Sequence, residues 1–357
     1  MSEALSIEQI RQVTPESYRY LFGQQAFKKW IDEKTMISSP DIRLSSMALY
    51  IPRIGQFLDF AKLKSTDDFI QQVQYAVESK DTKEWTETLD NWFKQLVFKE
   101  GLTRKYAREK IVTIIDFLSK FKINLDYRLP SIGKAKTKAA QFELTFDILR
   151  EAVLSTPAND PLRLFMLIMK DSGLSEMDVL NLDLNYRHHD PVNDRTYPSL
   201  ADQMQNPSSF YLTIAKNRYK TGVPTLTFLG PESSYTLITR RKYFLNENRL
   251  FPWTTVRGVE KRFKTIKDVL GKPHLYLKSI RSLFDTTIES PGENGIIKTE
   301  IAEIMMGHEI SDQVRRAYLR YGPKPLEDVY VSKYNDLRLF PKSLEGQAMS
   351  LTRDQLS

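Results

Sequence analysis

The sequence predicts an α+β fold that is mainly α-helical with a small antiparallel β-sheet. Apolar residues recur at helical spacing along most of the 357 residues, whereas alternation with a period of two is confined to residues 211–228. The length indicates two domains. The stretch 126–140 contains lysines, a proline and a glycine, and the chain is expected to divide there.

Residues 1–44 are expected to form a helical arm ahead of the first domain. Thr14-Pro15-Glu16 is a helix-start pattern, with a capping hydroxyl, a proline at the first helical position and an acid in the first turn. Residues 45–125 are then expected to form a compact all-α domain.

Two helices of that domain can be placed from their ends. One is predicted over residues 82–100, because its large apolar residues fall on one face, and Gly101 ends it. Thr103 is expected to cap the next helix. Its first turns hold the cations Arg104, Lys105 and Arg108. Cations there oppose the helix macrodipole, so either a bound phosphate offsets the cost or this is a solvated face.

The segment 126–140 is predicted to be a basic linker. Pro130 and Gly133 disfavour regular structure. Its central basic positions are Lys134, Lys136 and Lys138. A charge run of this kind is either a solvated linker or a segment that lies over the phosphates of a nucleic acid.

Residues 141–345 are predicted to form the second domain, followed by a tail at 346–357. Helices are expected at 142–153, 161–169 and 176–181. The alternating runs around 211–215 and 225–228 then predict a β-hairpin with Lys220-Thr221-Gly222 in its turn. Helices are expected to resume and to continue to about residue 338.

Charge and composition narrow the functional classes. The formal charge is +7, which favours a polyanionic partner. The absence of cysteine excludes disulfides, cysteine zinc sites and a thiol nucleophile. No run approaches the ~18 apolar residues of a membrane span, and the polar N-terminus is not a signal peptide. A cytoplasmic protein without a membrane partner is therefore expected.

Near the C-terminus, polar residues stand in an order that suggests phosphoryl chemistry. Lys278 precedes Arg281, Gly307-His308 follows an apolar run, and Tyr318 comes ten residues after the histidine. A free phenol has a pKa near ~10 and needs activation to attack. Attack on a phosphodiester builds charge on its non-bridging oxygens, and the planar fork of an arginine can bind two of them.

This ordered set resembles the active site of tyrosine recombinases, the phage-type integrases. The region after Tyr318 is most similar to integrases of archaeal viruses and plasmids. The resemblance covers residues 45–340, and it implies a helical core-binding domain that closes over DNA and a tyrosine recombinase catalytic domain. It also implies that the protein associates with DNA in the nucleoid and forms a homo-tetramer on double-stranded DNA, with exchange of C-terminal segments.

The resemblance assigns roles to individual residues. Tyr318 would be the nucleophile, with Tyr321 as its rival, and Arg281 and His308 would bind the scissile phosphate. Lys278 would stand where the family usually has a histidine. Lys220 would protonate the leaving 5′-oxygen, with Lys216 as the alternative. The expected DNA contacts are Arg104, Lys105, Arg108, Lys134, Lys136, Lys138, Arg257 and Lys261.

One element departs from the family pattern. The first catalytic arginine normally follows a Gly-Leu pair, and here Ser175 occupies its position, with Asp178 matching the acid of the motif. A serine cannot supply a bidentate cation, and loss of one such group costs several kcal/mol of transition-state stabilisation. Lys170 and Arg187 are the nearest replacements in sequence.

The function predicted from these residues is site-specific DNA recombination or integration by a mobile element, through a 3′-phosphotyrosyl intermediate and without a metal or other cofactor. His188-His189-Asp190 is not favoured as a metal site, because adjacent histidines point in different directions. Three alternatives stay open. They are a catalytically weakened DNA-binding relative, a topoisomerase-like or hairpin-forming enzyme, and a basic helical interaction protein with no DNA role.

Overall fold

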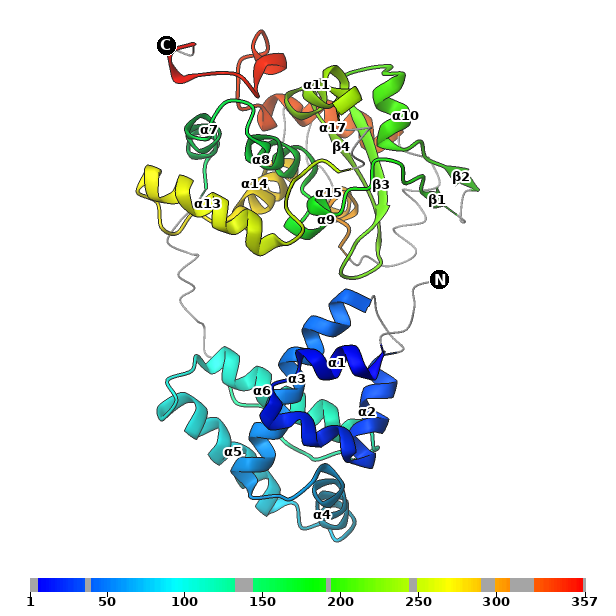
Figure 1. The fold of residues 1–357 in the computed structure, drawn as a ribbon, viewed down its shortest axis with the longest axis vertical. Helices are drawn as coiled ribbons and strands as arrows, with labels where there is room; N and C mark the ends of the chain where they lie inside the picture. Colours follow the sequence, from blue (N-terminus) through cyan, green and yellow to red (C-terminus); the bar gives the residue numbers. More distant parts are fainter. Residues whose placement is uncertain are drawn as a thin grey trace. The chain divides into compact units, whose positions relative to one another are not determined.

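The computed structural model describes residues 6–35, 40–131, 144–190, 194–243, 249–289, 299–308 and 324–355. The chain divides into two compact units, Met1–Lys136 and Thr137–Ser357. Each unit has its own hydrophobic core, and each is described by itself (Figure 1).

The first unit is entirely helical in its described part. Its elements are α1 (Ile7–Val13), the 3₁₀ segment η1 (Glu16–Gly23), α2 (Gln25–Thr35), α3 (Pro40–Ala61), α4 (Thr66–Glu78), α5 (Lys83–Phe98) and α6 (Arg104–Ser119). The predicted helix over 82–100 corresponds to α5, and Gly101 follows it at φ +69°. The cap predicted at Thr103 is confirmed, because its hydroxyl accepts a hydrogen bond from the Tyr106 amide at 3.2 Å.

Aromatic side chains fill the core of this unit. The rings of Phe57 and Trp92 lie 5.1 Å apart, and those of Trp30 and Phe117 lie 5.8 Å apart. Trp30 belongs to α2, within the segment expected to be a separate arm. That segment therefore shares one core with α3 to α6, and the expected boundary after residue 44 falls inside α3. The reason is that the apolar face of α2 is buried against the neighbouring helices of the same unit.

The second unit is α+β. Its helices are α7 (Phe146–Ser155), α8 (Pro161–Ser172), α9 (Glu176–Leu180), α10 (Leu200–Gln205), α11 (Pro231–Thr239), α13 (Val256–Leu270), α14 (Leu277–Glu289), α15 (Thr299–Met306) and α17 (Lys324–Leu337), with the 3₁₀ turns η3 (Glu345–Gln347) and η4 (Arg353–Gln355). Its strands are β1 (His189–Asp190), β2 (Arg195–Thr196), β3 (Leu212–Asn217) and β4 (Pro224–Leu229). The mainly helical α+β class is confirmed.

The predicted hairpin is confirmed. Strands β3 and β4 pair antiparallel, from Leu212 opposite Leu229 to Asn217 opposite Pro224. The two short strands β1 and β2 form a second antiparallel pair that the sequence did not predict. Two-residue strands are too short to show an alternating pattern.

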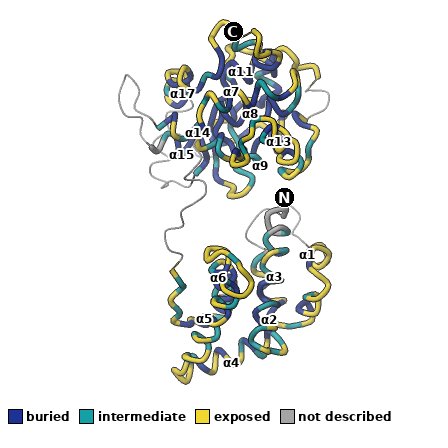
Figure 2. The backbone as a smooth tube through the Cα atoms, turned by 90° about the vertical axis from the view of Figure 1, so that its left-hand side faces the viewer, coloured by how far each residue is buried: buried dark blue, intermediate teal, exposed yellow. Residues whose placement is uncertain are grey.

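Helix α8 lies at the centre of the second unit, and all its residues after Pro161 are buried (Figure 2). This burial includes Lys170, whose ammonium group bonds the Asp171 carboxylate, Glu232 Oε2 at 2.6 Å and the Leu337 carbonyl at 3.0 Å. A buried cation needs such partners, because an unpaired charge in the interior is costly. The network connects α8 to α11 and to the end of α17.

The C-terminal segment packs on its own unit. The buried guanidinium of Arg163 donates hydrogen bonds to the carbonyls of Met349 and Leu351, at 3.2 and 2.8 Å. Leu351 and Ala348 belong to the main core of the unit. The stretch expected as a tail from residue 346 is therefore part of this core as far as Leu351. No helix in the described part of the chain is both long and apolar enough to cross a membrane.

Candidate active site

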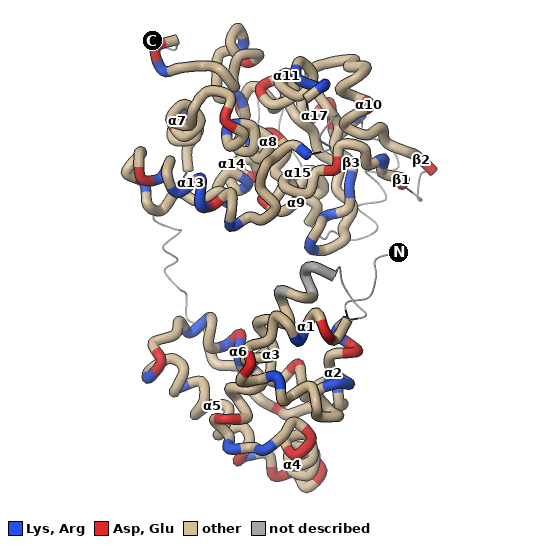
Figure 3. Tube along the Cα trace, viewed as in Figure 1, with Lys and Arg blue, Asp and Glu red and all other residues tan. Residues whose placement is uncertain are grey.

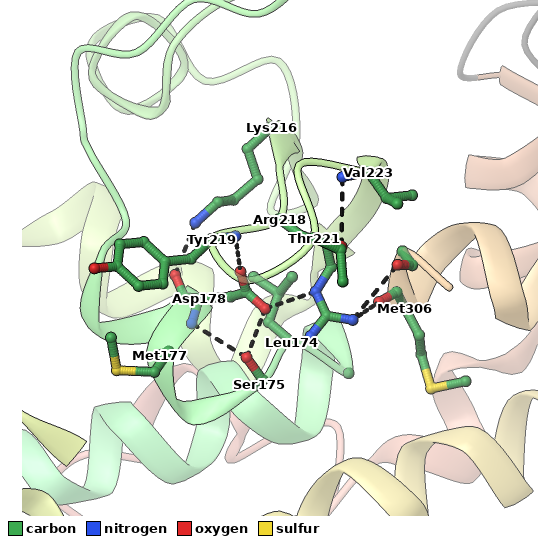
Figure 4. A network of polar contacts seen from close by, with 12 residues as sticks. Leu174, Ser175, Met177, Asp178, Lys216, Arg218, Tyr219, Thr221, Val223 and Met306 are labelled. Atoms are coloured by element: carbon green, nitrogen blue, oxygen red, sulfur yellow. Dashed lines mark hydrogen bonds and ion pairs between the residues drawn. The ribbon is translucent and has the colours of Figure 1, made fainter. Parts of the chain in front are cut away.

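A buried carboxylate connects the start of α9 to the turn of the β3–β4 hairpin (Figure 4). Asp178 Oδ2 accepts hydrogen bonds from the Ser175 hydroxyl at 2.6 Å and from Arg218 Nε at 2.8 Å. Its Oδ1 accepts from the Tyr219 amide at 2.8 Å. Ser175 also caps α9, since its hydroxyl accepts from the Asp178 amide at 3.3 Å. The carboxylate thus fixes the hairpin turn on the helix start.

The electrostatics of Asp178 follow from these bonds. Burial by itself raises the pKa of the carboxyl. The hydrogen bonds from Ser175 and from the Tyr219 amide, together with the charge of Arg218, outweigh burial. The pKa of Asp178 therefore lies below its ordinary value, and the group is a carboxylate at neutral pH.

Arg218 crosses from the hairpin turn to the end of α15. Its Nη1 donates to the Met306 carbonyl at 2.8 Å, and its side chain is only 10% exposed. Gly307 ends α15 at φ +64°, and a Cβ added there would lie 1.8 Å from Thr225 Oγ1 and 2.4 Å from Arg218 Cδ. The glycine is therefore required both by its backbone angle and by the space that Arg218 fills.

Arg281 and His308 are in direct contact. Arg281 Nη2 lies 2.7 Å from His308 Nε2 and 3.0 Å from the Met306 carbonyl oxygen, and its Nη1 donates to the Gly173 carbonyl at 2.7 Å. A guanidinium only donates, so His308 Nε2 is the acceptor. The histidine proton is then on Nδ1, which lies 2.6 Å from Glu303 Oε2. This arrangement assigns the Nδ1–H tautomer to His308.

The environment of Arg281 is unusual for an arginine. Burial is the larger influence on its guanidinium and the nearby Arg218 cation the next, and together they lower the pKa of Arg281 to about 10. Arg281 remains charged at neutral pH, and the carboxylates of Asp178, Asp285 and Glu176 offset only part of these two influences. Two guanidinium groups that donate to one carbonyl, that of Met306, form a site suited to a bound anion.

The predicted site residues fall into three groups. Arg281 and His308 are brought together. Lys220 and Lys278 are both exposed. Lys220 lies in the hairpin turn. Lys278 lies on the first turn of α14, and its ammonium is 5.5 Å from the centre of the Tyr276 ring. The residues that lie outside the described part are Tyr318, Tyr321, Lys134, Lys136 and Lys138.

Lys216, the alternative to Lys220, is held in the fold. Its ammonium donates to the carbonyls of Asp178 and Asn181, at 3.0 and 3.4 Å. Burial lowers the pKa of Lys216. Between the two hairpin lysines, Lys220 is the one whose side chain is exposed to solvent.

Neither replacement suggested for the missing arginine stands beside Ser175. Lys170 is fully buried in its own ion network. Arg187 pairs with Asp202, through bonds of 2.9 and 2.8 Å. Among the described residues, Arg218 is a cation that shares a hydrogen-bond partner, Asp178, with Ser175, and sequence reasoning missed it. The only signal for it was its position in the hairpin turn, two residues before Lys220.

The predicted DNA contacts that the structure describes lie on one helix in each unit. Arg104, Lys105 and Arg108 are on the first turns of α6, where Lys105 and Arg108 line a groove beside α3 together with Arg53. Nε of Arg108 has no hydrogen-bond partner within the described residues.

In the second unit, the sequence of α13 contains several lysines and arginines (Figure 3). Arg257 and Lys261 are both exposed on it, whereas Arg262 pairs with Asp160 at 2.7 Å. The apolar residues of α13 face the core, with Val259, Phe263 and Ile266 buried. The helix therefore presents its cations to solvent, where they are available to a polyanion.

Metal ligands do not gather in the part of the chain that the structure describes, where no cluster of three His, Cys, Asp or Glu residues occurs. His188 is buried and its pKa is lowered, first by burial and then by its neighbour His189. His189 is exposed and pairs across the short sheet with Thr196, at 3.3 Å between Nδ1 and Oγ1.

Comparison with known proteins gives structural likeness only. No protein-family model and no curated protein matches the sequence. The XerH site-specific recombinase, solved with a palindromic difH substrate after cleavage, is similar at 12% identity over 90% of this chain and 93% of that chain, with a TM-score of 0.46. The XerA recombinase is similar at 13% identity over 86% of this chain and 99% of that chain, with a TM-score of 0.33. Both TM-scores are low, and neither similarity carries an argument about function.

Proposed function

We propose that this chain is a DNA recombinase of tyrosine type, which cuts and rejoins DNA strands through a covalent phosphotyrosine. The observation that carries the proposal is the contact between Arg281 and His308, together with the hairpin that reaches the same place. Three segments far apart in sequence, around residues 175–178, 216–223 and 306–308, meet at the guanidinium groups of Arg218 and Arg281.

The chemistry begins with a phosphate at the guanidinium group of Arg281. The phenol of Tyr318 gives up its proton to solvent as its oxygen attacks phosphorus, and negative charge develops on the non-bridging oxygens. Arg281 meets that charge with N–H donors that are already oriented by the carbonyls of Gly173 and Met306. His308 would release Arg281 Nη2, take up a proton from solvent on Nε2, and donate a hydrogen bond from that atom to the phosphate.

Bond formation to Tyr318 is balanced by loss of the 5′-oxygen of the next nucleotide. Lys220 is proposed to give that oxygen its proton, because it is the exposed lysine of the hairpin turn. The products are a 3′-phosphotyrosyl link and a free 5′-hydroxyl. Attack by the 5′-hydroxyl of another strand reverses the step and restores the tyrosine, so the energy of the cut bond is conserved and no metal or nucleotide is consumed.

The partner proposed is double-stranded DNA. The cations on α6 and on α13 would each contact phosphates, and so would the lysines of the segment 126–140. Integration of a mobile element by a tetramer that exchanges C-terminal segments is the more detailed form of the proposal. In this monomer α17 and the chain as far as Leu351 pack on their own unit, so exchange of that segment would break the bonds that Arg163 makes.

A covalent-trapping experiment tests the proposal. The protein is incubated with duplexes of randomised sequence that carry nicks, so that cleaved ends diffuse away, and adducts are recovered in detergent and sequenced. We expect an adduct with the wild-type protein and with Tyr321→Phe, and none with Tyr318→Phe. Loss of the adduct with Tyr321→Phe alone would transfer the nucleophile to that residue.

The same experiment separates the alternatives. The presence of Ser175 in place of an arginine favours a DNA-binding relative without activity, which predicts strongly salt-dependent binding to DNA and no adduct. A topoisomerase-like enzyme predicts an adduct and relaxation of supercoiled plasmid without joining of two sites. If the affinity for DNA is weak and does not change with salt concentration, the recombinase, the inactive DNA-binding relative and the topoisomerase-like enzyme are all excluded.

A further inference from the structure

We infer that Arg218 of the hairpin turn supplies the cation that is missing at Ser175, and that it contacts the same phosphate as Arg281. This inference rests on the proposed function. It adds a catalytic residue in the turn of the β3–β4 hairpin, whereas Ser175 stands at the start of α9.

The first support is the position of Arg218 relative to Ser175. Asp178 Oδ2 accepts from both side chains, at 2.6 Å from the Ser175 hydroxyl and 2.8 Å from Arg218 Nε. The two side chains therefore meet at a single carboxylate oxygen (Figure 4). A short side chain at position 175 leaves room for a long one that enters from the hairpin.

The second support is the position of Arg218 relative to Arg281. Arg218 Nη1 and Arg281 Nη2 both donate to the Met306 carbonyl oxygen, at 2.8 and 3.0 Å. The two guanidinium groups therefore border a common space. Within the described residues, Nη2 of Arg218 has no hydrogen-bond partner, so one edge of its fork remains for a ligand.

The third support is the absence of a side chain at Gly307. The stem of Arg218 runs where a Cβ on that residue would stand, 2.4 Å from Cδ and 2.7 Å from Cγ. The path of the arginine thus depends on the glycine that precedes His308. Hydrogen bonds to Asp178 and Met306 orient the guanidinium of Arg218, so it needs little reorganisation to bind an anion.

A purely structural role is the competing explanation, because the bond from Arg218 to Asp178 also fixes the hairpin on α9. The two roles differ in what they respond to. A cation that binds the phosphate responds to the charge on the non-bridging oxygens, whereas a residue that only holds the hairpin does not.

The experiment compares two substrates and three variants. The duplex recovered by covalent trapping is synthesised with its normal scissile phosphate or with a methylphosphonate, in both diastereomers, which removes the negative charge. Arg218→Gln keeps amide donors towards Asp178 and loses the charge, while Arg218→Lys keeps the charge and loses the fork. Arg187→Ala is the matched control, since it removes an arginine–aspartate pair that shares no residue with the candidate site.

On the phosphate substrate we expect Arg218→Gln to slow adduct formation by ~10²–10³-fold, the usual loss for one transition-state donor. On the methylphosphonate the loss should fall to within about tenfold. Arg218→Lys should lie between Arg218→Gln and wild type, and Arg187→Ala should react as wild type on both substrates.

Two results would overturn the inference. One is an equal loss for Arg218→Gln on both substrates, which is the behaviour of a structural residue. The other is no loss at all on the phosphate. Failure of the proposed function looks different, because the wild-type protein would then form no adduct with any duplex. Circular dichroism and amide exchange of the α9 and hairpin peptides show whether each variant is folded, and Arg218→Lys provides the comparison if Arg218→Gln is not.

Discussion

Replacement of Gly307 by alanine tests how closely the end of α15 packs on the hairpin. The residue has φ +64°, a conformation that costs an alanine about 1–2 kcal/mol. The added Cβ would also meet Thr225 Oγ1 at 1.8 Å and Arg218 Cδ at 2.4 Å. Overpacking of this kind typically costs about 1–3 kcal/mol. We therefore expect Gly307→Ala to destabilise the second unit by about 2–5 kcal/mol.

Gly271 offers a matched control. It ends α13 at φ +63°, and a Cβ added there has nothing within 4 Å. Gly271→Ala should therefore carry the backbone cost alone, about 1–2 kcal/mol. The difference between the two variants isolates the contact of Gly307 with Thr225 and Arg218.

Hydrogen exchange read by mass spectrometry is the appropriate assay, because peptides from the two units are resolved and the unfolding free energy of the second unit is read separately. Equal losses for Gly307→Ala and Gly271→Ala would refute the reasoning. That result would mean that the neighbours of Gly307 move away at no cost. In the trapping assay Gly307→Ala should also form less adduct, because it displaces Arg218.

Three further predictions concern the second unit. Lys170→Met leaves the Glu232 carboxylate buried without its cation, and should lower the unfolding free energy of the unit by about 3–5 kcal/mol in hydrogen exchange; a loss below 1 kcal/mol would contradict this. Arg163→Ala removes the donors to Leu351 and should make the C-terminal segment cleave faster in limited proteolysis, with unchanged rates for α6 peptides as the internal control. The lowered pKa of Asp178 means that its contribution is present above the unfolded-state pKa of ~3.9 and is lost as pH falls below it. Protection of the hairpin amides should therefore decline in acid, and Asp178→Asn should flatten that decline.

Residues of the candidate site could be predicted where their order and spacing in the sequence indicate the chemistry. Arg281, Gly307 and His308 were selected from their spacing, and Arg281 and His308 do meet. Arg218 was not selected, because its partners Asp178 and Met306 are 40 and 88 residues away in the chain. An arginine in a turn gives no sign of the direction in which its long side chain will point.

Local sequence determined much of the architecture. Helical and alternating periodicity, the cap at Thr103 and the turn after residue 217 each depend on side chains a few residues apart, so the helices and the β3–β4 hairpin could be read directly. The tertiary structure alone decided the rest. It merged the N-terminal helices with the first unit, packed the C-terminal segment against Arg163, and placed Arg218 beside Ser175. Those outcomes depend on which distant surfaces bury one another and on where a buried charge finds its partner, and no short stretch of sequence contains that information.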